Sequence, residues 1–183
     1  MKKFFFLVLF ALSVSFASAQ DDVTKFLGIP VDGPKSEMIK KLQEKGFVYD
    51  KVKGHLTGTF NGEKVVMQIY TNGNGDVWRV ALIDVAVRDE IEIKIRFNRI
   101  FGQFQNNGNY ELVGGSALSE RENIDYGITV EKKRYSATFS QKSSGKPDQN
   151  NRVWFMINKQ NRDYRILMLY DNERNNPSNG ADL

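Results

Sequence analysis

The sequence predicts an α+β protein made of two tandem units, each a helix followed by four strands, that share one antiparallel sheet. Apolar stripes at helical spacing occur twice, and alternating strand-like runs follow each of them. The strand-like runs are joined by short turns such as Asn61-Gly62, which connect antiparallel neighbours, whereas parallel strands need long crossovers. One face of the sheet would then cover the helices, and the other face would be wet.

Residues 1–19 carry the pattern of an export signal. Two lysines precede the nearly uninterrupted apolar run Phe4–Phe16, and Ala17–Ala19 supplies the small residues of a cleavage site before Gln20. The alternative is a membrane anchor, but the run is shorter than the roughly 20 residues that a spanning helix needs, and no basic flank follows it. We therefore expect an exported protein, periplasmic or extracellular, with no transmembrane segment in the mature chain.

Composition and charge exclude several classes of protein. The chain contains no cysteine, so disulfides and thiol chemistry are excluded. Loss of residues 1–19 removes two lysines and no acids, which lowers the net charge from +4 to +2. A charge this small does not indicate nucleic acid or an anionic membrane as a partner. The chain is long enough for one compact domain or for two small units that share a sheet.

The first unit covers residues 20–87. Its helix begins near Pro34, which suits a first helical turn, and Met38 and Leu42 share its apolar side. Gly46 is the expected C′ residue, because glycine takes the left-handed conformation without a Cβ clash. The strands expected after this helix are Phe47–Lys53, His55–Asn61, Lys64–Thr71 and Val77–Val87.

The second unit covers residues 88–171 and begins with a helix over residues 89–107. Asp89 and Glu92 stand at capping-box spacing, and an apolar stripe with helical steps continues to Phe104. The rival interpretation is a strand, because apolar and charged residues also alternate over residues 91–97. The continuation of the stripe and the polar stop after it favour the helix.

Strands are expected again after this helix, with polar loops at residues 116–123 and 143–151. The expected strands are Asn109–Val113, Tyr126–Glu131, Arg134–Gln141, Arg152–Lys159 and Tyr164–Asp171. The C-terminal tail, residues 172–183, is polar, and we expect it to be loosely attached.

Three pairs of strand segments suggest that the two units arose by duplication. They match in the same order: Leu56–Phe60 with Tyr135–Phe139, Val65–Asn72 with Val153–Gln160, and Trp78–Ile83 with Tyr164–Leu169. The alternative is that amphipathic strands resemble one another by chance, and the second unit does carry an extra stretch near residues 116–126.

Three segments resemble a family of uncharacterised exported proteins of Bacteroides-type bacteria: FLGIPVDGPKSEMIKKLQEKGF at residues 26–47, VWFMINKQ at 153–160 and LYDNERNNPSNGADL at 169–183. The resemblance covers nearly the whole mature chain, but its motifs carry no known chemistry. The order of elements is also similar to the tandem fold of β-lactamase inhibitory protein. That similarity implies a curved sheet with the helices behind it and a concave open face, and it implies nothing about the inhibitor's target.

Catalytic and metal-binding chemistry have little support in the residue types. His55 is the only histidine, and cysteine and the Gly-x-Ser-x-Gly motif are absent, so a nucleophilic triad and a zinc site lack partners. The pairs Asp89/Glu90 and Glu120/Glu122 could serve a glycoside hydrolase, although a helix start and a solvated loop explain them more simply. Phosphate-loop, dinucleotide and EF-hand spacings are also absent, so no cofactor and no metal are expected.

The outer face of the sheet is the candidate binding surface. Strand alternation places five side chains of interface-forming types on it: Tyr70, Arg79, Trp154, Met156 and Arg165. Arg79 and Arg165 occupy equivalent positions in the two units. The alternative is that Trp154 and Met156 pack under a neighbouring loop and that the arginines merely solvate the sheet.

The sequence therefore predicts a non-enzymatic exported binding module that recognises a protein or peptide partner through the outer face. The second hypothesis is a carrier or sensor of a small apolar ligand between helices and sheet, in a pocket lined by Met67, Ile93 and Phe97. A hydrolase that uses carboxylates ranks last. The sequence leaves the identity of the partner and the oligomeric state open.

Overall fold

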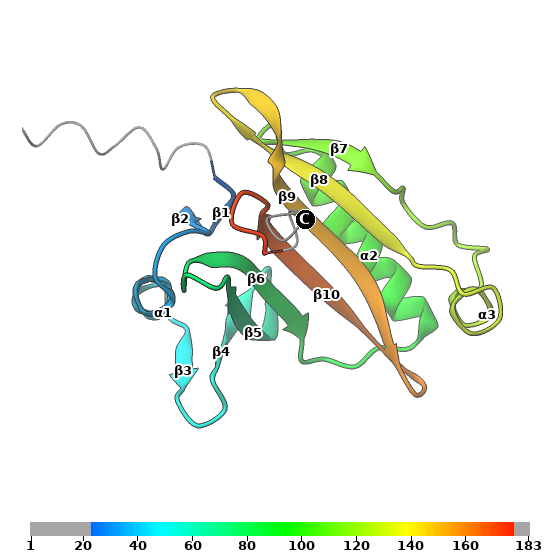
Figure 1. The fold of residues 1–183 in the computed structure, drawn as a ribbon. Helices are drawn as coiled ribbons and strands as arrows, with labels where there is room; N and C mark the ends of the chain where they lie inside the picture. The colour runs from blue at the N-terminus through cyan, green and yellow to red at the C-terminus, as the bar shows by residue number, and fades with distance from the viewer. Residues whose placement is uncertain (1–22, 178–183) are drawn as a thin grey trace, which may run out of the picture.

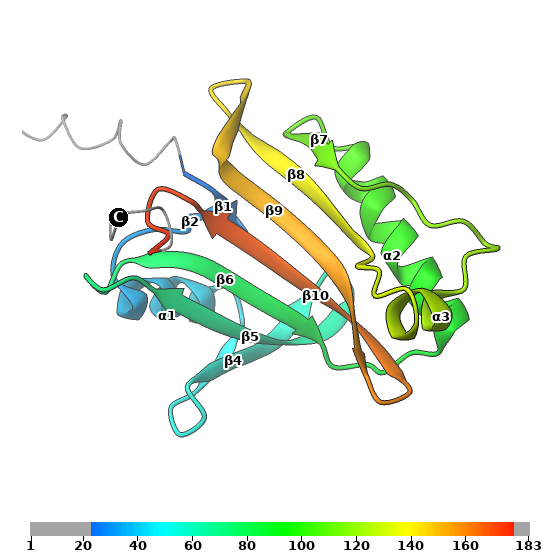
Figure 2. The same ribbon diagram turned by 45° about the vertical axis from the view of Figure 1, so that its right-hand side comes forward.

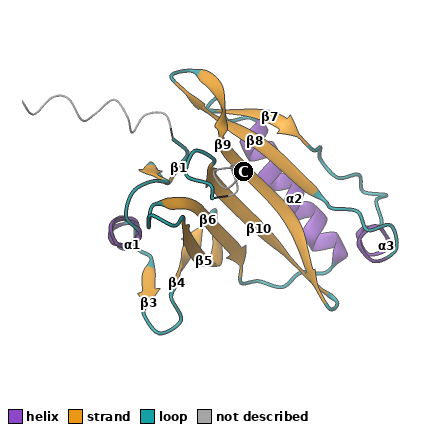
Figure 3. Cartoon of the chain, viewed as in Figure 1, coloured by secondary structure: helices purple, strands orange, loops and turns teal. Residues whose placement is uncertain are grey.

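The computed structural model describes residues 23–177 as a mixed α/β chain dominated by one large antiparallel sheet (Figure 1 and Figure 3). Its eight strands lie in the order β3-β4-β5-β6-β10-β9-β8-β7. They are β3 (Val48–Asp50), β4 (His55–Phe60), β5 (Glu63–Thr71), β6 (Val77–Asp84), β7 (Tyr110–Gly114), β8 (Ser136–Ser143), β9 (Lys146–Gln160) and β10 (Asp163–Asn172). The expected export signal lies outside the described residues, as do residues 178–183 of the tail.

The first helix, α1 (Lys35–Glu44), is capped as the sequence predicts at its C-terminal end. Gly46 has a φ of +93°, and its N–H donates to the Gln43 carbonyl at 2.9 Å. The Phe47 N–H donates to the Leu42 carbonyl at 3.1 Å, which completes a Schellman motif. Pro34 is the N-cap rather than a first-turn residue, one position earlier than expected.

The second helix, α2 (Glu90–Gln105), settles the ambiguity of residues 91–97 in favour of the helix. The Asp89 carboxylate accepts from the Glu92 N–H at 2.8 Å, and the Glu92 carboxylate accepts from the Asp89 N–H, so the capping box is present. Ile93 is buried, whereas Ile91 and Ile95, which a strand would place on the same face as Ile93, are exposed. The strand interpretation is therefore wrong.

Two expectations for the second half of the chain are wrong. Residues 126–131 do not form a strand: Asn123 caps a short helix, α3 (Ile124–Thr129), by accepting from the Tyr126 N–H at 2.8 Å. Residues 143–151 are not a loop, because Ser144 and Gly145 both have positive φ and form a tight turn that lets β8 and β9 continue as a polar hairpin.

The N-terminal segment and the start of the tail are both tied to the sheet. A two-stranded hairpin, β1 (Lys25–Phe26) and β2 (Ile29–Pro30), precedes α1. The ring of Phe26 lies 4.9 Å from that of Tyr170 and 5.1 Å from that of Phe60, so this hairpin closes the core between the two halves. Asn172 belongs to β10, and its amide donates to the Val31 carbonyl at 3.0 Å, so the tail is attached at its start.

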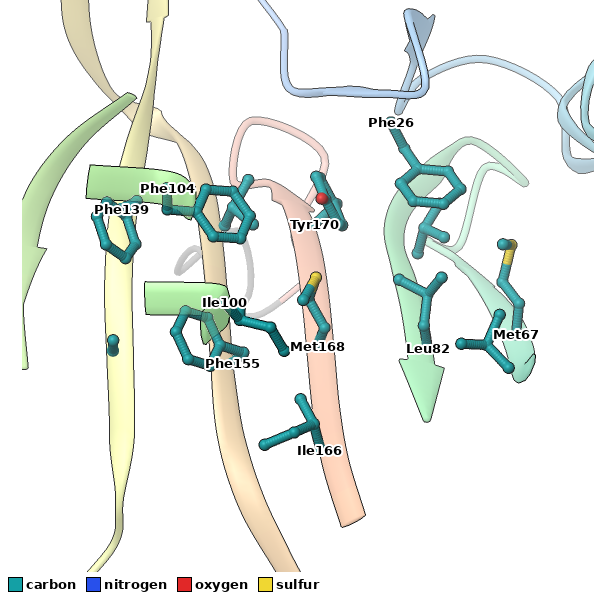
Figure 4. Close-up of a cluster of buried hydrophobic side chains, with 14 of the residues drawn as sticks. Phe26, Met67, Leu82, Ile100, Phe104, Phe139, Phe155, Ile166, Met168 and Tyr170 are labelled. Atoms are coloured by element: carbon teal, nitrogen blue, oxygen red, sulfur yellow. The ribbon is translucent and has the colours of Figure 1, made fainter. Parts of the chain in front are cut away.

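One hydrophobic core extends across six of the eight strands of the sheet. Opposed residues on six neighbouring strands form a continuous buried row: Leu56, Met67, Leu82, Met168, Phe155 and Ala137. The same core takes in Met38 and Leu42 of α1 and Ile93 and Phe97 of α2. Figure 4 shows part of this core, with Ile100 and Phe104 of α2 near Phe155 of β9. At its centre β6 pairs with β10, so the last strands of the two halves lie side by side (Figure 2).

Glycine at position 58 is required by this packing. A Cβ built on Gly58 would lie 2.4 Å from Cδ1 of the buried Phe47 ring, whereas one on Gly73, in a turn, meets nothing within 4 Å. We expect Gly58→Ala to lower the free energy of unfolding by about 1–3 kcal/mol through overpacking, measured by urea denaturation. The control Gly73→Ala should change it by less than about 0.5 kcal/mol. Equal effects of the two substitutions would contradict this packing argument.

Candidate functional site

The five predicted site residues lie on one face of the sheet, which we call the outer face. Tyr70 of β5 is directly opposite Arg79 of β6, and Arg79 is opposite Asp171 of β10. Trp154 of β9 is opposite Leu169, two residues from Asp171 on β10. Because side chains alternate along a strand, these positions face away from the buried core row.

A buried carboxylate organises one end of the outer face. Asp171 is only 1% exposed, and its two oxygens accept from Nε and NH2 of Arg79, each at 2.6 Å. The indole Nε1 of Trp154 donates to Asp171 Oδ2 at 2.8 Å. The guanidinium carbon of Arg79 lies 4.3 Å from the centroid of the Trp78 ring and 5.6 Å from that of Trp154. We call Tyr70, Trp78, Arg79, Trp154 and Asp171 the aromatic–arginine cluster.

Strict alternation missed Trp78, because a β-bulge interrupts β6. Tyr70 pairs with Arg79, but Thr71 pairs with Val77, so two residues of β6 stand opposite one step of β5. The bulge lets Trp78 lie against Arg79, and the Trp78 ring lies 6.4 Å from the Tyr70 ring. The signal in the sequence is the spacing of Val77 and Val80, which are three residues apart and both fully buried.

The middle of the outer face is apolar. Four half-buried side chains stand opposite one another on β5, β6, β10 and β9: Val66, Ile83, Leu167 and Met156. The neighbouring row toward the cluster has Ala81, Leu169 and Trp154 on β6, β10 and β9, and it ends at the polar Gln68 of β5. We call these two rows the apolar band, and it places Met156 next to Trp154 on the same strand face.

Arg165 shares the outer face but not the cluster. It stands opposite Asn158, on the far side of the apolar band from Arg79. Asp171 lies six positions after Arg165 on β10, which corresponds to about 20 Å along an extended strand. The structure therefore brings four of the five predicted residues together and leaves Arg165 at the opposite rim, where the buried Oδ1 of Asn158 has no hydrogen-bond partner within residues 23–177.

Three of the four acidic residues that the sequence offered for hydrolysis have structural partners, and among the described residues Glu120 accepts only through its backbone carbonyl, from Lys94. Asp89 caps α2, and the Glu90 carboxylate accepts from the Ile124 N–H at 2.7 Å. The Glu122 carboxylate accepts from the Tyr135 hydroxyl at 2.7 Å, and this bond lowers the pKa of Glu122. A lowered pKa is opposite to the raised pKa that a general acid needs near neutral pH.

Burial and the same carboxylate raise the pKa of Tyr135 to about 12. His55 stands opposite Asp50 in the β3–β4 hairpin, apart from the aromatic–arginine cluster. Among residues 23–177, no group of three His, Cys, Asp or Glu side chains is placed to hold a metal ion.

By its fold class, the chain is a mixed α/β protein with one broad antiparallel sheet. No protein-family model matches the sequence, and no curated protein or solved structure matches it significantly. No helix in the described part of the chain is long and apolar enough to cross a membrane.

The Asp171–Arg79 pair can be tested by a double-mutant cycle. We expect Arg79→Ala and Asp171→Ala each to lower the free energy of unfolding by about 1.5–3 kcal/mol, because each leaves a charged partner without its hydrogen bonds. The double variant should cost less than the sum, with a coupling energy of about 1 kcal/mol or more in urea denaturation.

Arg152→Ala is the matched control for this cycle. Arg152 also stands opposite Asp171, on β9, but it is exposed and donates to the Gln149 carbonyl instead. We expect its loss to change stability by less than about 0.5 kcal/mol. Additive effects of Arg79→Ala and Asp171→Ala would show that the pair does not organise the cluster.

Proposed function

We propose that the protein is a non-enzymatic exported module that binds a protein or peptide partner through the outer face of its sheet. The observation that carries this proposal is the apolar band, which has the aromatic–arginine cluster at one end and Arg165 at the other. A sheet face in contact with water alone usually carries polar side chains. An apolar centre with a charged rim is instead typical of protein interfaces.

The cluster supports the proposal because it is already ordered in the free protein. Asp171 holds Arg79 in a bidentate pair and Trp154 by its indole N–H. Tryptophan, tyrosine and arginine are the residue types that most often dominate binding energies. Because these side chains are fixed before contact, this protein would lose less conformational entropy when a partner binds.

The proposed duplication of a helix-plus-four-strand unit is consistent with a binding site on the outer face, because it relates the two halves of that face to each other. The sequence match of Trp78–Ile83 with Tyr164–Leu169 aligns Leu82 with Met168, and these two residues are also paired in the sheet. A residue paired with its own equivalent is what a two-fold axis through β6 and β10 requires. We propose that this duplication places α1 and α2 behind the same face of a curved sheet, as in β-lactamase inhibitory protein.

The hypothesis of an apolar ligand between helices and sheet gains no support from the residues chosen for it. Met67, Ile93 and Phe97 are fully buried members of the packed core. None of the three lines the cleft of about 540 Å³ that is described below. We therefore keep protein or peptide recognition as the proposed function. The same proposal includes export of the chain, with residues 1–19 acting as the signal.

Replacement of the anchors should weaken partner capture without loss of folding. We expect Trp154→Ala combined with Tyr70→Ala to reduce capture from an envelope extract of the producing organism at least tenfold, because both rings leave the surface. The captured protein is identified by mass spectrometry, purified and titrated against each variant. Circular dichroism and thermal unfolding monitor the fold.

The matched control is Tyr126→Ala combined with Val130→Ala. Both residues are exposed at or just after α3 and lie outside the outer face. We expect this variant to capture the partner as the unaltered protein does. Equal capture by the Trp154/Tyr70 variant would remove the proposed function, whereas a loss at Arg165→Ala as well would extend the contact across the whole apolar band.

A further inference from the structure

A cleft of about 540 Å³ lies on the core side of the sheet, separate from the outer face. Its walls come from the β1–β2 hairpin, the β4–β5 turn, the C-terminal end of α2 and the β7–β8 pair, and Tyr170 of β10 also lines it. The two halves of the chain and the N-terminal hairpin therefore meet there. Small-molecule sites occur preferentially at such junctions, with volumes of about 300–1,000 Å³.

Tyr170, a largely buried residue of the core, lines this cleft with its hydroxyl (Figure 4). The residue is 4% exposed, and its hydroxyl forms no hydrogen bond with any residue in the range 23–177. Burial raises the pKa of Tyr170 well above its usual range, so the hydroxyl keeps its proton and can both donate and accept. The hydroxyl oxygen is not among the fully buried polar atoms that lack a partner, so it is open to the cleft. A polar ligand in the cleft would exchange a hydrogen bond with it.

Amide side chains around the cleft are held in fixed orientations. Asn61 Nδ2 donates to Gln103 Oε1 at 2.7 Å, which leaves the Asn61 oxygen and the Gln103 nitrogen for other groups. Gln141 accepts from the Lys25 N–H at 2.5 Å and donates to the Tyr110 hydroxyl at 3.0 Å. Because the Tyr110 hydroxyl accepts in its bond with Gln141, that bond does not use the Tyr110 hydroxyl proton. The cleft offers donors and acceptors in similar measure.

The charges around the cleft disfavour a cationic ligand. No Asp or Glu lines it, so an ammonium group would find no carboxylate. Two lysines, Lys25 and Lys142, line it, together with Gln103 and Asn107 at the C-terminal end of α2, where the helix dipole is negative and opposes an anion. A polyhydroxyl ligand can accept from a lysine and donate to carbonyl groups, and its C–H faces suit the rings of Phe60 and Phe104.

From these observations we propose that the cleft binds a small neutral saccharide, a mono- or disaccharide, with the Tyr170 hydroxyl as a buried hydrogen-bonding group. The site is separate from the proposed protein-binding face and does not rest on it. Its failure or success therefore leaves the outer-face proposal unaffected, and the two are tested by different variants.

Saturation-transfer NMR and calorimetry on the mature chain, expected to begin at Gln20, test the proposal. The probes are glucose, galactose, maltose, lactose and cellobiose, with glucuronate and glucosamine as charged counterparts. We expect at least one neutral sugar to bind. Tyr170→Phe, which keeps the ring and removes the hydroxyl, should weaken that binding about tenfold, the effect of one lost hydrogen bond.

Two further variants separate binding from folding. Tyr126→Phe makes the same chemical change at an exposed tyrosine outside the cleft and should leave sugar affinity unchanged. Gln103→Trp fills the cleft from α2 and should abolish binding while circular dichroism stays unchanged. Binding by none of the neutral sugars would overturn the proposal. So would binding of glucuronate or glucosamine alone, or an unaltered affinity in both Tyr170→Phe and Gln103→Trp.

Discussion

The pairing of β6 with β10 is the constraint on which the rest of the structure depends. Five residue pairs, from Arg79–Asp171 to Ile83–Leu167, join the last strands of the two halves into one sheet. This pairing makes the buried row continuous from Leu56 to Ala137, and it makes the apolar band continuous on the opposite face. A shift of the β6–β10 register by one residue would move the buried side chains of one half to the face that carries the apolar band of the other half.

A buried ion pair fixes the same junction from the side of α2. Arg96 of α2 is almost fully buried, and its guanidinium donates to the Asp84 carboxylate at the end of β6, with an Nε–Oδ2 distance of 3.1 Å. Arg88, in the connection between β6 and α2, donates to the same carboxylate at 3.0 Å. Two cations on one buried acid hold the helix of the second half over the last strand of the first.

Local chemistry in the sequence predicted α1, α2 and most strands, because caps and turns are short-range features, but it did not predict α3. The capping box at Asp89 and the reversal at Gly46 are both present. The errors arose where one residue outweighs the pattern around it. Asn123 caps a helix over an apolar, β-branched run, and Ser144-Gly145 turns a polar stretch into a hairpin.

The candidate site was predictable in part for the same reason. Alternation places Tyr70, Arg79, Trp154 and Met156 on one face, but only the register shows which of them touch. The pairing that brings Asp171 under Arg79 joins residues 92 positions apart, and such long-range geometry leaves no local signal in the chain. The bulge that adds Trp78 lies between the consecutive strands β5 and β6, and its signal is the spacing of Val77 and Val80.

The C-terminal end of β10 connects the two candidate sites through the pleat of a single strand. Tyr170 points to the cleft on the core side, and Asp171, the next residue, holds Arg79 and Trp154 on the outer face. The Asp171 carbonyl also accepts from the Thr24 hydroxyl, and the Asn172 amide donates to the Val31 carbonyl. The N-terminal hairpin is thus fastened to the strand segment from which both surfaces project. Loss of that hairpin would loosen the wall of the cleft and the support of the aromatic–arginine cluster together, because consecutive residues of one strand cannot move independently.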